Sequence, residues 1–224
     1  MLLAIDTSTR NVGVAVYDGI QVLSETIWSS RDYHTVELAP AIAETLARAG
    51  YKVQQLKLVA VATGPGSFTG LRIGMAVAKG LALACHLPIV GIPTLDIVAE
   101  SQPVSLGISM AAILQAGRGR LAVGWYRADD GCWQLDAPVE IMDAFTLSRQ
   151  IHEPTLICGE LDEEQQHTLA RKYKNVILVS PAHAVRRPAL LAELAWKRWQ
   201  AGDVDDPATL SPTYLHHGEP IPNP

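Results

Sequence analysis

The stretch that decides the fold is residues 58–74, LVAVATGPGSFTGLRIG. Its first five residues form a continuous apolar run, which is typical of a strand buried on both faces of a sheet. The turn residues at 63–66 end that strand, and Ser67 or Thr69 is placed to cap a helix that we expect over residues 70–85. A second buried strand at 88–92 completes a strand-helix-strand unit, so the sequence predicts an α/β fold.

The helix predicted over 70–85 carries a small residue at every fourth position. These residues are Gly70, Gly74, Ala78 and Ala82. Because residues four apart share one face of a helix, this face is nearly bare backbone and another helix could approach it closely. Two interpretations remain open on these residues alone. The face docks on a partner protein, or a helix predicted over 37–49 covers it within the monomer.

The chain before this unit predicts three antiparallel strands and one helix. The strand candidates are residues 2–5, 12–17 and 20–27, and a hairpin signal, Asp18-Gly19, precedes the last of them. The helix candidate, 37–49, has an apolar stripe at spacing four, formed by Leu38, Ile42 and Leu46.

The second half of the chain repeats the opening pattern. Strand candidates at 109–114 and 121–126 flank a polar turn, and later strands at 155–158 and 176–179 alternate with helices at 162–173 and 189–201. This repetition suggests a duplicated architecture. We expect a first lobe at 1–103, a smaller second lobe at 104–205 and a proline-rich tail at 206–224.

The composition indicates a soluble cytoplasmic protein that does not bind nucleic acid by itself. The 224 residues are 48% hydrophobic, enough for a sizeable core, and the net charge is -5. Asp6 and Lys79 interrupt the apolar segments that contain them, so we expect neither a secretory signal nor a membrane span. The three cysteines form no paired ligand motif and are expected to be reduced core residues: Cys85, Cys132 and Cys158.

Two segments are candidate parts of a nucleotide or phosphate loop. They are Asp6, Thr7 and Ser8 after the first strand, and Gly64, Gly66 and Ser67 before the predicted helix. Backbone N–H groups and the helix dipole could hold a phosphate there. However, the loop lacks the lysine of a P-loop, and its third glycine comes one residue late for GxGxxG. The structural alternative is that Asp6 caps its own turn and the glycines let the helix pack closely on the sheet.

Asp6 and the three residues after it also resemble the first phosphate loop of actin-like and sugar-kinase ATPases. Such enzymes need a second carboxylate from the duplicated half, where this chain has Gln115. A neutral amide does not supply the anionic ligand that Mg²⁺ prefers, so we expect no ATP hydrolysis. No histidine stands four residues after His34, where Leu38 is found, and no GxSxG or HExxH motif occurs. We therefore expect no catalytic residue, metal or cofactor in this chain.

Four segments of the first hundred residues resemble the TsaB (YeaZ) family. They are residues 3–9 (LAIDTST), 34–37 (HTVE), 64–74 (GPGSFTGLRIG) and 78–82 (AKGLA), with weaker support from 124–126 and 212–215. The resemblance implies an actin-like (ASKHA) α/β fold with two related lobes of mixed sheet and flanking helices. It also implies a role in forming N6-threonylcarbamoyladenosine at position 37 of tRNAs that read codons beginning with adenine.

In that family, catalysis and a metal held by an HxxxH pair belong to the paralogue TsaD. The resemblance therefore implies a non-catalytic subunit that docks on a TsaD-like partner through helices of its first lobe. The implied interface residues are Leu38, Ile42, Leu46, Gly70, Leu71, Gly74, Met75, Ala78, Lys79 and Ala82. Further implied partners are a TsaE-like ATPase, a second copy of the chain when TsaD is absent, and tRNA indirectly through the complex. ATP and metal are expected on the partner subunits.

The chain departs from the family pattern at two positions. Gln115 stands where family members commonly carry an acidic residue, and His216 stands where they commonly carry a basic one. Both departures argue against a nucleotide on the second lobe. Two other functions remain as alternatives. One is a weak ATP-binding actin-like enzyme, and the other is a glycoprotease-like peptidase, for which the chain offers no nucleophile, activated water or metal.

Overall fold

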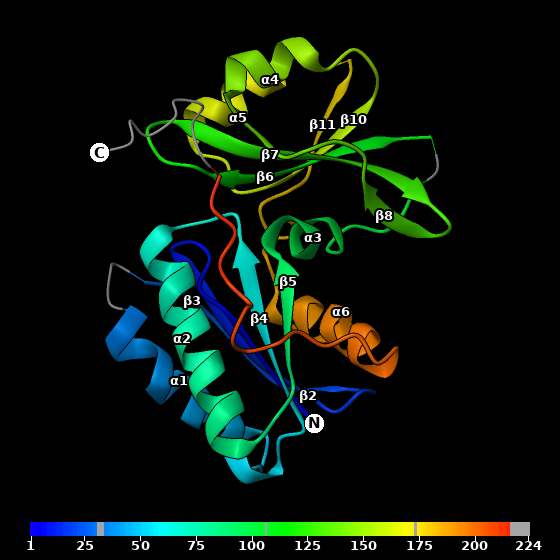
Figure 1. Ribbon diagram of the computed structural model, residues 1–224. Helices are drawn as coiled ribbons and strands as arrows, with labels where there is room; N and C mark the ends of the chain where they lie inside the picture. Colours follow the sequence, from blue (N-terminus) through cyan, green and yellow to red (C-terminus); the bar gives the residue numbers. More distant parts are fainter. Residues whose placement is uncertain (31–33, 106, 173, 216–224) are drawn as a thin grey trace, which may run out of the picture.

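The structure is a computed structural model that describes residues 1–30, 34–105, 107–172 and 174–215. It consists of two lobes, each built on one β-sheet (Figure 1).

The first lobe contains a five-stranded sheet in the order β3-β2-β1-β4-β5. Its strands are β1 (Leu2–Asp6), β2 (Asn11–Tyr17), β3 (Val22–Ser29), β4 (Leu58–Gly64) and β5 (Ile89–Pro93). The first three strands are antiparallel, and β4 and β5 join parallel to β1. The central strands β1 and β4 are buried along their whole length. The predicted antiparallel opening and the buried strand before the glycine-rich turn are therefore confirmed.

Helices cover both faces of this sheet (Figure 1). Two of them, α1 (His34–Arg48) and α2 (Phe68–Cys85), lie on one face, and α6 (Pro188–Gln200) lies on the other. A short 3₁₀ helix at Val53–Gln55 follows α1. Because successive side chains of a strand point to opposite faces, β1 contributes to both layers. Leu3 and Ile5 pack in the core beside α1 and α2, whereas Leu2 and Ala4 pack in the core beside α6.

Helix α6 falls within residues 104–205, which the sequence assigns to the second lobe. Its buried residues Leu191, Ala192 and Ala195 nevertheless pack on the first sheet. The chain therefore crosses to the second lobe after α3 (Thr94–Ala99) and returns to the first lobe between β11 (Val176–Leu178) and α6.

The second sheet has the order β11-β10-β6-β7-β8, with β9 also paired to β7. The other strands are β6 (Ser109–Gln115), β7 (Arg120–Asp129), β8 (Cys132–Leu135), β9 (Glu140–Asp143) and β10 (Thr155–Gly159). Like β1 in the first sheet, β6 has an antiparallel neighbour, β7, and a parallel one, β10. The predicted duplication is thus confirmed.

Two helices of the second lobe, α4 (Ala144–Gln150) and α5 (Glu163–Ala170), lie together above its sheet (Figure 1). The sequence patterns do not predict α4, β8 or β9. The three cysteines are free, but only Cys158 is buried, and Cys132 at the start of β8 is exposed. The expectation of a core position is therefore wrong for Cys132.

Helix α3 lies between the two lobes (Figure 1). Its Ile97 belongs to the core beside α6, whereas Leu95 and Val98 belong to a core of the second lobe. The hydroxyl of Tyr126, on β7, donates a hydrogen bond of 2.6 Å to Asp96 of this helix. The helix therefore contacts the cores of both lobes.

The described part of the tail lies against the first lobe. Just before it, Asp205 accepts a hydrogen bond of 2.8 Å from the backbone N–H of Gly91. Further on, the N–H of Thr213 donates to the carbonyl of Thr63 at 2.7 Å. These contacts hold the chain beside the first half of β5 and then beside the carboxyl end of β4. Residues 216–224, which include His216, lie outside the described residues.

Candidate functional site

The candidate phosphate-loop residues meet where the carboxyl ends of β1 and β4 adjoin the start of α2. Asp6 ends β1, and its Oδ1 accepts a hydrogen bond of 2.9 Å from the backbone N–H of Ser8. Short side chains with an acceptor oxygen favour such turns because they replace a missing backbone partner. Asp6 therefore caps its own turn, as the structural alternative predicted.

The glycines allow α2 to approach this turn closely. The N–H of Ser67 donates to the carbonyl of Ser8 at 2.6 Å, and a Cβ on Gly66 would lie 2.2 Å from that same oxygen. The Oγ1 of Thr7 donates to the carbonyl of Gly70 at 2.6 Å. Ser67 also caps α2 by accepting from the N–H of Gly70 at 3.3 Å. Polar groups of the turn after β1 therefore form hydrogen bonds with polar groups at the start of α2.

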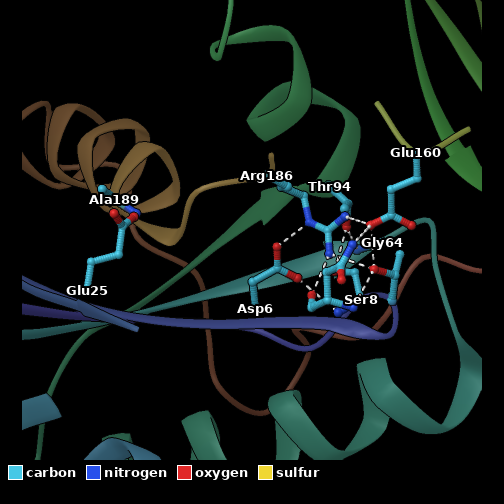
Figure 2. A network of polar contacts seen from close by, with 10 residues as sticks. Asp6, Ser8, Glu25, Gly64, Thr94, Glu160, Arg186 and Ala189 are labelled. Carbon is cyan, nitrogen blue, oxygen red and sulfur yellow. Dashed lines mark hydrogen bonds and ion pairs between the residues drawn. The ribbon is translucent and has the colours of Figure 1, made fainter. Parts of the chain in front are cut away.

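Thr94, the first residue of α3, connects the two loops from the second-lobe side (Figure 2). Its hydroxyl accepts a hydrogen bond of 3.1 Å from the N–H of Gly64 and lies 2.9 Å from the hydroxyl of Ser8. All three residues are buried, so this contact fixes the position of Gly64 relative to the β1 turn.

The sequence patterns do not single out the residue at the centre of the site, Arg186, in the segment between β11 and α6. Its side chain is 1% exposed. The guanidinium Nε donates to Asp6, and Nη1 donates to Glu160 at 2.9 Å. Nη2 donates to the hydroxyl of Thr9 and to the carbonyl of Asn11, both at 3.0 Å (Figure 2). One buried cation therefore binds two carboxylates, a hydroxyl and a carbonyl.

Arg186 is the single cation that the described residues place between the carboxylates of Asp6 and Glu160. Burial by itself lowers the pKa of Arg186, but the attraction of the Asp6 and Glu160 carboxylates outweighs burial, so the pKa of Arg186 is raised. The guanidinium stays positive and donates to both carboxylates. Among the described residues, no group of three His, Cys, Asp or Glu side chains is placed to hold a metal ion.

The sequence analysis predicts neither Arg186 nor Glu160 at this site. Arg186 lies 180 positions after Asp6 and 26 positions after Glu160, so no local pattern links the three residues. The position of Glu160 directly after a strand is a signal that could have identified it. This strand, β10, pairs with β6 in the second sheet as β4 pairs with β1 in the first. Side chains of functional sites often follow the carboxyl ends of such parallel strands.

Gln115, at the end of β6, makes contacts within the second lobe. Its Nε2 donates to Gln165 of α5 at 2.6 Å and to the carbonyl of Glu160 at 3.3 Å. The amide thus links β6 to α5 and to the residue after β10.

An open cleft of about 1430 Å³ lies between the lobes beside these loops. Ser67 and Phe68 line it from the first lobe, and Gln115 and Asp162 line it from the second. Tyr214 of the tail also lines the cleft and stacks on Phe68, with 5.0 Å between the ring centroids. The tail therefore reaches the cleft.

The small-residue face of α2 points into the first lobe. Six residues expected at a partner interface are buried on α2: Gly70, Leu71, Gly74, Met75, Ala78 and Ala82. A Cβ on Gly74 would lie 2.2 Å from the Oγ1 of Thr7. A partner cannot reach this face in the folded chain, which corrects the first interpretation of the stripe. Gly70 and Gly74 are small because Thr7 of the β1 turn approaches them, whereas Ala78 and Ala82 share a buried core with Leu38, Ile42 and Leu46 of α1, as the second interpretation predicted.

The accessible side of α1 and α2 carries an apolar groove of about 480 Å³. Its lining includes Ile42 and Leu46, two of the residues expected at the interface, together with Val77 and Leu81 of α2. Leu38 is buried in the core and does not line the groove, and Lys79 is half-buried. We define the α1–α2 face as this groove, whose lining includes the exposed Ala39, Ala43 and Ala47, together with two exposed residues of α2, Gly80 and Leu83.

Solved structures confirm the predicted actin-like class of two related lobes. YeaZ from Pseudomonas aeruginosa is 23% identical, with a TM-score of 0.78 over 96% of this chain and 99% of that chain. The ethanolamine utilization protein EutJ from Carboxydothermus hydrogenoformans is 15% identical, with a TM-score of 0.52 over 85% and 88% of the two chains. These likenesses concern the fold.

Sequence comparison narrows the class to a family. TsaB of Bacillus subtilis is 32% identical over 223 residues, which is 97% of this chain and 95% of that relative. TsaB of Escherichia coli is 34% identical over 134 residues, 59% and 58% of the two chains. Residues 21–195 match the family model of TsaD, tRNA N6-adenosine threonylcarbamoyltransferase. This chain belongs to the TsaB family, within that wider group.

Proposed function

We propose that this chain is a non-catalytic subunit that docks on a TsaD-like catalytic subunit through the α1–α2 face. The complex would form N6-threonylcarbamoyladenosine at position 37 of tRNAs reading codons that begin with adenine. Both TsaB relatives are named as tRNA threonylcarbamoyladenosine biosynthesis proteins, which supports the pathway. The observation that carries the docking role is the apolar groove between α1 and α2.

The α1–α2 face has the properties of a surface for helix docking. Its groove is lined by aliphatic side chains of both helices, and Leu83, another apolar residue of α2, is 65% exposed. Gly80 is exposed, and a Cβ added there would have no heavy atom within 4 Å, so a partner helix can approach the backbone of α2. Standard interfaces bury about 1,600 Å² in total, which a pair of helices from each partner can supply. The same surface would serve a homodimer when TsaD is absent.

The buried site supports a non-catalytic role for this chain. Asp6, the carboxylate that resembles a phosphate-loop ligand, is bound by Arg186 inside the protein. ATP and metal would then be bound by the partner subunits, including a TsaE-like ATPase, and tRNA would be reached through the complex. We place the complex in the cytoplasm, where tRNA is modified.

The test is threonylcarbamoyl transfer to tRNA with TsaD and the other pathway proteins, with and without this chain and its variants. Gly80→Arg adds a long charged side chain to the α1–α2 face without a clash in the monomer. Ala170→Arg adds the same charge at an exposed end of α5. We expect Gly80→Arg to lose transfer and binding to TsaD by calorimetry, while Ala170→Arg keeps both.

Circular dichroism establishes that both variants fold. Binding of TsaD by Gly80→Arg at the parent affinity would remove the proposed docking face. Full transfer without this chain would remove the proposed function.

A further inference from the structure

The buried guanidinium of Arg186 joins the two lobes. Asp6, Thr9 and Asn11, which it binds, belong to β1, β2 and the turn between them in the first lobe. Glu160 follows β10 in the second lobe. Figure 2 shows the side chains of Asp6 and Glu160 on different sides of the guanidinium.

Glu160 is the second-lobe half of this contact. Its Oε1 accepts from Nη1 of Arg186 at 2.9 Å, from the hydroxyl of Thr9 at 2.7 Å and from the amide of Asn11 at 3.2 Å. A single carboxylate oxygen of the second lobe is thus held by three donors, two of them from the first lobe. Its side chain is 18% exposed, so water screens these contacts only partly.

The geometry points to Arg186 as an internal cation that holds the two lobes at one angle without a bound metal or nucleotide. Two-lobed proteins change conformation when a ligand binds one arrangement of the lobes better than the other. In this chain, the protein itself supplies the positive charge between Asp6 and Glu160. An open arrangement would separate Glu160 from Arg186, Thr9 and Asn11 and so break the charge-assisted hydrogen bonds that join the lobes, which are stronger than neutral ones. This inference does not depend on the proposed function.

The neighbouring residue offers a matched control. The Nε of Arg187 donates to Glu25 of β3 at 3.0 Å. The same carboxylate accepts from the N–H of Ala189 at 3.0 Å (Figure 2). This ion pair lies wholly within the first lobe, and Arg187 is 54% exposed. Arg187→Gln therefore removes the same charge one position away without removing a contact between the lobes.

The experiment is double electron–electron resonance between two nitroxide labels, one on each lobe. One label is placed on Cys132, which is naturally exposed on β8, and the other on Gln21→Cys in the exposed turn between β2 and β3, with Cys85 changed to serine. In the parent we expect a narrow distance distribution that saturating Mg²⁺ and ATP do not shift. Arg186→Gln should broaden the distribution and lengthen its mean, whereas Arg187→Gln should match the parent.

Glu160→Gln is the second variant, for the case in which Arg186→Gln does not fold. It keeps the first-lobe pair of Asp6 and Arg186 but removes the second-lobe charge, so the distribution should again broaden. A parent-like distribution in the folded Arg186→Gln protein, or in Glu160→Gln, would overturn the inference. A shift of the parent distribution by Mg²⁺ and ATP would overturn it equally.

Discussion

Replacing Gly74 by alanine measures how closely α2 packs on the β1 turn. The added Cβ would lie 2.2 Å from the Oγ1 of Thr7, which is buried and donates to the carbonyl of Gly70. Overpacking costs about 1–3 kcal/mol, and loss of that hydrogen bond costs about 1 kcal/mol. Alanine regains about 1 kcal/mol of helix propensity over glycine. The net destabilisation expected for Gly74→Ala is therefore about 1–3 kcal/mol.

Gly80 provides the control on the same helix. It is exposed, and an added Cβ meets no heavy atom within 4 Å, so Gly80→Ala gains about 1 kcal/mol from helix propensity alone. The two variants should differ in unfolding free energy by about 2–4 kcal/mol. Urea unfolding followed by tryptophan fluorescence is the assay. With a slope of about 2–3 kcal/mol per molar urea, the two midpoints should differ by about 0.7–2 M.

Equal midpoints for Gly74→Ala and Gly80→Ala would refute this account of the stripe. They would mean that the small-residue face of α2 is open rather than packed against Thr7, and the first interpretation of the stripe would return. A lower midpoint for Gly80→Ala than for the parent would show that this position is covered, which would also contradict the proposed α1–α2 face.

Four further predictions concern other contacts, each measured by urea unfolding against the parent. Tyr126→Phe removes the hydroxyl that donates to Asp96 and should cost about 1–3 kcal/mol; an unchanged midpoint would contradict this. Burial raises the pKa of Asp96, so the folded state loses stability relative to the unfolded state as pH rises from about 4 through that raised pKa. The stability of Asp96→Asn relative to the parent should therefore increase over this window, and a constant difference would contradict the shift. Ser67→Ala removes the cap of α2 and should cost about 1 kcal/mol, whereas Ser67→Asp should keep most of it. Asp205→Ala leaves the N–H of buried Gly91 without that acceptor and should cost about 1–3 kcal/mol, together with faster hydrogen exchange at Gly91; slow exchange would show another acceptor.

The sequence predicts the local elements well because their signals are local. The hairpin signal is an example, since the Oδ1 of Asp18 accepts from the N–H of both Ile20 and Gln21 at 2.7 Å. The cap at Ser67 is another. Such contacts span two or three residues, and the residue types that form them are few.

Two features are not readable from local patterns. A small-residue stripe shows that something approaches α2 closely, but spacing alone does not distinguish a partner helix from Thr7 of the same chain. Arg186 and Asp6 meet only after the chain has built the second sheet and returned to the first lobe. The same return explains why α6 packs on the first sheet although it follows the second sheet in the sequence. Its apolar residues alone do not indicate which of the two sheets they cover.

Helix α3 has a thermodynamic consequence for the whole chain. Ile97 packs beside α6, while Leu95 and Val98 pack in the second lobe, so melting of either lobe exposes one side of this helix to water. If the chain were divided after α3, neither part would have a complete core. Helix α6 would be separated from the first sheet, and α3 would be separated from the core of the second lobe. The two lobes should unfold as one cooperative unit, with a single calorimetric transition and equal calorimetric and van't Hoff enthalpies.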